Sequence, residues 1–131
     1  MLRYIPLILI GLAAGAQAQP PTPAPTPVIS LAMHYTSARA RMIQAGFVPF
    51  RPVPADSEMF KRNFAGREAI ARKFPEAAKC QSQGKSPCYF LFARGPDEIV
   101  AITTVGAHAE TLIVRKVHVA TAQEAERFYQ E

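Results

Sequence analysis

The chain has 131 residues and a formal net charge of +5. Its seven glycines are too few and too scattered for a phosphate-cradling loop, and two cysteines alone do not complete a zinc site. About one hundred residues follow the N-terminal segments described below, which is enough for one small domain with a single core.

The first eighteen residues have the three parts of a secretory signal peptide. Arg3 supplies positive charge, residues 4–16 are mostly apolar, and Ala16-Gln17-Ala18 is a small-x-small cleavage site. The apolar run has about thirteen residues, whereas a spanning helix needs about twenty. An uncleaved membrane anchor is the alternative. We predict a signal peptide over residues 1–18, cleavage after Ala18, no transmembrane span in the mature chain, and a periplasmic or secreted location.

Residues 19–27 form a proline-rich spacer. Prolines in the run PPTPAPTP remove backbone donors and fix φ, so that neither a helix nor a sheet can form there. A proline-rich ligand for an aromatic groove is the alternative. We expect residues 28–131 to form a single domain.

The first half of this domain reads as helical. Residues 35–45 predict a helix that Thr36 or Ser37 caps and that Gly46 ends. The proline-rich run at residues 47–54 is extended and could be an edge strand. Residues 56–74 predict a helix with a break near Gly66. The candidate core side chains of this second helix are Met59, Phe60, Phe64, Ile70 and Phe74.

Three apolar, β-rich runs follow at residues 88–94, 98–106 and 110–120. Short turn-prone links join them, which favours an antiparallel meander. The tail begins with a capping-box pattern, and a short helix or a frayed end follows. The predicted class is α+β, with N-terminal helices packed on one face of a three- to four-stranded antiparallel meander and one disulfide.

The pattern of the third run does not show which face of the sheet is buried. Leu112 and Val114 would face one side, whereas Ile113, Val117 and Val119 would face the other. Strict alternation cannot therefore assign the side that the helices cover.

The stretch CQSQGKSPC holds Cys80 and Cys88. An exported chain meets an oxidising compartment, where neighbouring thiols normally pair. In the chain-entropy model a ring of about nine residues contributes roughly 2.5 kcal/mol to stability. A redox-active pair, which is more usually C-x2-C, and a pair of metal ligands are the alternatives. We interpret the pair as a structural disulfide.

Two blocks of sequence carry a resemblance. Gly46, Phe47 and Pro49 form a Gly-aromatic-x-Pro turn after a short helix. Phe74, Pro75, Glu76, Cys80 and Cys88 precede a β-rich tail. The arrangement resembles small exported bacterial proteins of unassigned function. The order of helices and strands is also similar to β-lactamase-inhibitor-like and outer-membrane-assembly-lipoprotein-like folds, which bind other proteins. The lipid-bearing cysteine of the latter group is missing here, so its membrane role does not carry over.

The residues that usually perform catalysis form no known motif. His34, His108 and His118 are far apart, and the adjacent Asp97 and Glu98 lie in a predicted hairpin turn. A nucleophile elbow is also missing from the sequence. We predict no catalytic residues, cofactor or metal, with a hydrolase assembled from scattered residues as the alternative.

Charge is distributed unevenly along the chain. From Arg39 to Arg94, eleven basic residues face four acids, a balance of +7, whereas three face six from Asp97 onward, a balance of −3. A solvated helical face explains this pattern, and so does a docking surface for an acidic partner. Nucleic acid is not expected, because export separates it from the protein and aromatic residues are not interleaved. The predicted basic patch contains Lys61, Arg62, Arg67, Arg72, Lys73, Lys79 and Lys85.

These observations favour an exported, non-catalytic binding or inhibitory module that engages an envelope or secreted protein. The exposed sheet face would be the contact surface and the basic patch its rim. The alternative is a structural envelope component held by charge to anionic surface polymers.

Overall fold

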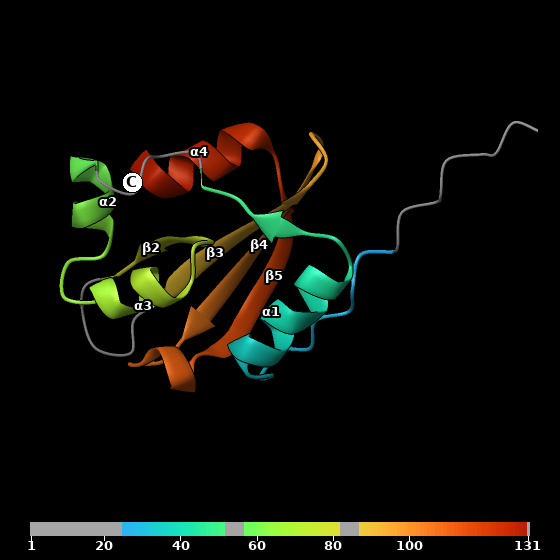
Figure 1. Cartoon of the computed structure of the whole chain (residues 1–131), viewed down its shortest axis with the longest axis horizontal. Helices are drawn as coiled ribbons and strands as arrows, with labels where there is room; N and C mark the ends of the chain where they lie inside the picture. Colours follow the sequence, from blue (N-terminus) through green and yellow to red (C-terminus); the bar gives the residue numbers. More distant parts are fainter. Residues whose placement is uncertain (1–24, 52–56, 82–86, 131) are drawn as a thin grey trace, which may run out of the picture.

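The computed structural model describes residues 25–51, 57–81 and 87–130, which form an antiparallel five-stranded sheet with helices packed against it (Figure 1). The predicted α+β class and the disulfide are confirmed. The sheet has five strands rather than three or four. The expected signal peptide, residues 19–24 of the spacer and Lys85 lie outside the described residues. Within the described ranges, no helix is long and apolar enough to cross a bilayer.

The elements follow one another with short connections. The first half holds α1 (Tyr35–Gln44), β1 (Val48–Pro49), α2 (Glu58–Asn63) and α3 (Glu68–Lys73). The second half holds β2 (Ala77–Cys80), β3 (Cys88–Arg94), β4 (Glu98–Val105), the 3-10 turn η1 (Ala109–Thr111), β5 (Ile113–Ala120) and α4 (Ala122–Gln130).

The helices α1 and α3 start without a side-chain capping hydrogen bond. α1 starts one residue before the expected cap, so that His34 precedes it and makes no side-chain capping bond. The prediction of Thr36 or Ser37 as the cap was wrong. The predicted break at Gly66 is confirmed, because its φ of +80° separates α2 from α3.

The helices α2 and α4 start with hydroxyl caps. The Ser57 hydroxyl accepts a hydrogen bond from the Phe60 amide at the start of α2. The predicted cap of the last helix is confirmed, because the Thr121 hydroxyl accepts from the amide of Glu124 at 3.2 Å. The tail is therefore a helix.

Two strands share one edge of β3. β1 pairs with the end of β3 and β2 with its beginning, while β4 occupies the opposite edge. The two short strands meet at Leu91, whose carbonyl accepts from the Phe50 amide and whose amide donates to the Glu76 carbonyl. β2 is the strand that the sequence did not predict, since residues 74–80 were expected only to lead into the disulfide loop.

The disulfide lies within this edge. Cys80 of β2 is directly opposite Cys88 of β3, with the two Cα atoms 4.0 Å apart, and both residues are buried. It therefore fastens β2 to β3 at the mouth of the connecting loop.

Helices cover both faces of the sheet, and not one face only. The larger core lies between the sheet and the helices α1 and α3, where it includes Met42, Ile70 and Phe90. The smaller core lies on the other face and includes Leu91 and Ala125 of α4. In Figure 1, α4 crosses one side of the sheet and α1 lies on the other. The sheet face that the sequence left open for a partner is thus partly covered by α4.

A β-bulge explains the mixed apolar pattern of the last strand. The register between β4 and β5 shifts at Thr103/Thr104, so that Arg115 is an extra residue. As a result, Val114 lies in the larger core and Val117 packs against the same core, although three positions separate them.

Candidate functional site

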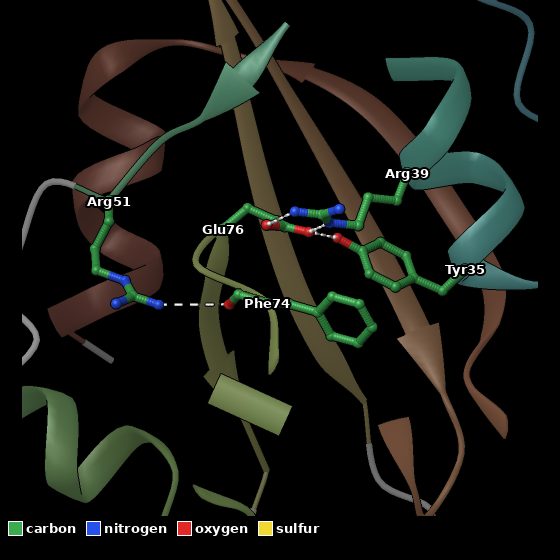
Figure 2. A network of polar contacts seen from close by, with 5 residues as sticks. All are labelled: Tyr35, Arg39, Arg51, Phe74 and Glu76. Atoms are coloured by element: carbon green, nitrogen blue, oxygen red, sulfur yellow. Dashed lines mark hydrogen bonds and ion pairs between the residues drawn. The ribbon is translucent and has the colours of Figure 1, made fainter. Parts of the chain in front are cut away.

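A buried network of three polar side chains joins α1 to the sheet (Figure 2). Glu76 has no exposed surface and lies just before β2. Its Oε1 accepts hydrogen bonds from the Tyr35 hydroxyl and from Arg39 Nε, each at 2.6 Å. Arg39 Nη2 lies 3.5 Å from the second carboxylate oxygen. A buried carboxylate is therefore held by one cation and one hydroxyl.

Aromatic rings surround this network. The Tyr35 ring stacks on Phe90 with centroids 4.0 Å apart, and it meets Phe74 edge-on at 5.0 Å. The Arg39 guanidinium lies 5.7 Å from the centre of the Phe74 ring. Burial, together with the neighbouring charge of Glu76, raises the pKa of Tyr35 well above its ordinary value.

The network positions α1 and leaves little of itself on the surface. Tyr35 and Glu76 are fully buried, and only Arg39 reaches solvent, with 29% of its side chain exposed. This set of residues was not predicted from the sequence. Tyr35 and Arg39 are four residues apart, hence on one helix face, and Glu76 interrupts the otherwise apolar run around β2. These two signals together could have indicated an internal ion pair.

Arg51 belongs to a neighbouring contact, shown opposite the network in Figure 2. Its guanidinium lies 4.7 Å from the centre of the Phe60 ring, and Nη2 is 3.5 Å from the Phe74 carbonyl. The cation therefore links the segment after β1 to α2 and to the end of α3.

The predicted basic patch divides in the structure. Arg62, Arg72 and Lys79 lie on α2, α3 and β2, with both arginines exposed. Lys61 and Lys73 are exposed too, but each makes an ion pair, with Glu58 at 3.2 Å and with Glu110 at 3.3 Å. We call the five side chains that reach the surface the cationic group: Lys61, Arg62, Arg72, Lys73 and Lys79.

Arg67 does not belong to that surface. Only 7% of the residue is exposed, and its guanidinium donates to the carbonyls of Gln81 and Gly106. Burial lowers its pKa. Arg67 therefore ties the start of α3 to the disulfide loop and to the end of β4. The helical pattern around residue 67 gave no indication of this inward position.

Local hydrogen bonds hold the exposed acids close to the cationic group. Backbone amides of Glu68 and Gly66 lower the pKa of the Glu68 carboxyl, and Arg72 contributes to the same shift. The pKa of Glu110 is lowered by its own backbone amide and by Lys73. Both carboxylates therefore stay ionised at neutral pH beside the cations.

The three histidines come from different segments of the fold. His34 is exposed before α1 and bridges to Ile113, and His108 is exposed at the start of η1. His118 is half-buried on β5, with Nε2 4.0 Å from a carboxylate oxygen of Glu124. Within the described ranges, no three metal-ligating side chains gather in one place.

The hairpin acids have separate surroundings. Glu98 forms an ion pair with Arg94 at 2.9 Å, and the guanidinium of Arg94 also covers the Phe47 ring at 4.6 Å and donates to the Ala45 carbonyl. Asp97 is exposed in the turn between β3 and β4. Glu98 therefore contributes a structural contact, whereas Asp97 lies on the surface.

An open hollow of about 520 Å³ lies at the end of the sheet where β4 leads into η1. Its polar hydroxyl, that of Thr111, accepts from the His108 amide and donates to the His108 carbonyl. The lining is mainly apolar and consists of Val105, Gly106, Ala107, His108, Thr111 and Ile113.

Comparison of the chain with protein-family models, with curated proteins and with solved structures gave no match. The resemblance to small exported proteins therefore stays a prediction.

Proposed function

We propose that the protein is an exported, non-catalytic binding module that engages an acidic envelope or secreted protein through the cationic group. The observation that carries this proposal is the position of Arg62 and Lys79. Neither forms an ion pair with a described residue, and both come from elements packed side by side, since α2 and α3 both contact β2. Their charge is available to a partner.

The structural disulfide supports the exported location. A buried cross-strand pair such as Cys80–Cys88 is typical of proteins that work in oxidising compartments. The cationic group lies at the end of the molecule formed by α2, α3 and β2, to the left in Figure 1. Negative charge on a partner would steer it toward this end and speed association.

A structural envelope component bound to anionic surface polymers is the second candidate. The spread of five cationic side chains over three elements favours it, because a repeating polyanion needs charge and does not need a shaped pocket. The two candidates differ in the partner's chemistry and in their response to salt.

The test uses the mature chain and the envelope fraction of the producing cells. The double variant Arg62→Glu/Lys79→Glu should lose most binding, whereas Arg41→Glu/Arg127→Glu, with the same change in net charge at exposed arginines of α1 and α4, should keep it. Equal loss in both variants, or in neither, would refute the cationic group as the contact.

Two treatments then distinguish the candidates. Digestion of the envelope fraction with a protease should abolish binding if the partner is a protein and leave it intact if the partner is a polymer. At about 0.5 M salt the Debye length is about 4 Å, so a purely electrostatic polymer contact should disappear. Binding that survives this salt indicates a packed protein interface.

A further inference from the structure

The outer edge of β5 is covered over only its first two residues. The Ala32 amide donates to the Val114 carbonyl at 2.8 Å, and the Val114 amide donates to the Met33 carbonyl at 2.9 Å. The N-terminal segment then turns away, because Ala32 has a φ of +69° and the Met33 amide bonds back to the Ser30 carbonyl. The segment therefore leaves the rest of this edge.

Beyond Val114 the edge is open among the residues that the structure describes. β5 is the last strand in the order β1-β3-β4-β5, and β4 occupies its other side. Lys116 is exposed, and 72% of Val119 is exposed although its cross-strand neighbour Val100 is buried. Lys116, Val117 and Val119 thus lie along a strand edge about 13 Å long with which no other described strand pairs.

The two faces of this edge differ in chemistry. Val117 and Val119 pair with Ile102 and Val100, on the side of the larger core. Lys116 pairs with Thr103 on the opposite side of the sheet. A strand added here would place apolar side chains beside the valines and the alternate ones beside the lysine.

The charge of β5 favours a different partner over a second copy of the chain as the occupant of this edge. β5 carries Arg115 and Lys116, both exposed, and none of its residues is acidic. Two copies paired edge to edge would bring the four cations of two β5 strands together, and cations at an edge generally oppose such pairing. The same two cations attract a strand that carries acidic residues.

We propose that the open edge of β5 accepts one further strand from a partner, in an extended segment where acidic residues alternate with β-branched ones. Main-chain hydrogen bonds would provide the affinity, and the alternation would provide the specificity. This site goes beyond the cationic group and lies at the opposite edge of the sheet from β2. The two proposed binding surfaces can therefore be tested independently.

The probe is the acetylated and amidated peptide TEVEVT, with TVVEET as a control of the same composition and broken alternation. Added to the isotopically labelled mature protein at about 0.15 M salt, the first peptide should shift the amide resonances of residues 116–119. Lys116→Glu replaces an attractive pair with a repulsive one and should weaken binding about tenfold, which corresponds to about 1.4 kcal/mol. Arg62→Glu/Lys79→Glu should leave the affinity within about twofold, because charges screened over a Debye length of about 8 Å act little across the sheet.

Three results would overturn the proposal. Equal affinity for the control peptide would show that charge acts without strand pairing. Shifts confined to α2, α3 and β2 would place the peptide on the cationic group. Concentration-dependent dimers that disappear in Lys116→Glu would identify a second copy as the occupant. Loss of envelope binding in Arg62→Glu/Lys79→Glu is judged separately and does not depend on the peptide.

Discussion

The ion pair between Arg39 and Glu76 should be asymmetric when its two partners are removed separately. Arg39→Met leaves a fully buried carboxylate with the Tyr35 hydroxyl as its remaining partner. Removal of one partner from a buried pair generally costs about 3–5 kcal/mol. Because 29% of the Arg39 side chain is exposed, water can reach part of the site, and we expect the lower end, about 3 kcal/mol.

Glu76→Gln should cost less. Glutamine keeps the volume and still accepts from the Tyr35 hydroxyl, and the partly exposed guanidinium of Arg39 can turn to solvent. The expected loss is about 1.5–2 kcal/mol, the lower part of the range for a hydrogen bond to a charged group. The loss of stability in the double variant should be smaller than the sum of the two single losses, since the second substitution removes the group that the first left unpaired.

The assay is urea unfolding at neutral pH, followed by far-ultraviolet circular dichroism because the chain has no tryptophan. Arg41→Met is the matched control, since Arg41 is an exposed arginine of the same helix whose Nη1 contacts the Val28 carbonyl at 3.0 Å. We expect it to change stability by less than about 0.5 kcal/mol. If Glu76→Gln proves as costly as Arg39→Met, or if Arg39→Met costs less than about 1 kcal/mol, the reasoning is wrong.

Three further predictions concern stability. Because the pKa of Tyr35 is raised in the folded state, its contribution to stability is complete below about pH 10, the unfolded pKa, and is lost as pH rises toward the folded pKa. The unfolding free energy of the native chain should therefore fall more steeply above about pH 10 than that of Tyr35→Phe. Parallel pH curves would contradict this. Cys80→Ala/Cys88→Ala should lower stability by about 2.5 kcal/mol in urea unfolding, and an unchanged midpoint would exclude a structural role for the disulfide. Gly106→Ala should lower the melting temperature, because φ is +144° and an added Cβ would lie 2.8 Å from the Thr111 carbonyl oxygen, whereas Ala107→Gly is the control and should have a smaller effect.

The sequence predicted the parts of the fold that local chemistry determines. Gly66 divides two helices, Thr121 caps the last one, and three β-rich runs form a meander. The disulfide followed from the pairing of two cysteines in an exported chain, and the structure places them directly opposite each other. Each of these features depends on residues close together in the chain.

The features that the sequence did not predict depend on distant contacts. β2 is too short for a periodic pattern, and its pairing with β3 requires the chain to return to an edge already shared with β1. The mixed pattern of Val114 and Val117 was visible, but strict alternation assigns them to opposite faces unless a bulge intervenes. The inward position of Arg67 depends on carbonyls at residues 81 and 106, beyond the reach of a local pattern.

The shared edge of β3 also has a kinetic consequence. The hairpins β3–β4 and β4–β5 join neighbours in the chain, whereas β1 must cross more than forty residues to reach Ala93, and such distant pairings form slowly. Covalent linkage secures only the β2 half of the edge, so β1 can detach while its neighbour stays in place. Amide protons facing Val48 and Pro49 should consequently exchange with solvent sooner than those beside the sulfur bridge.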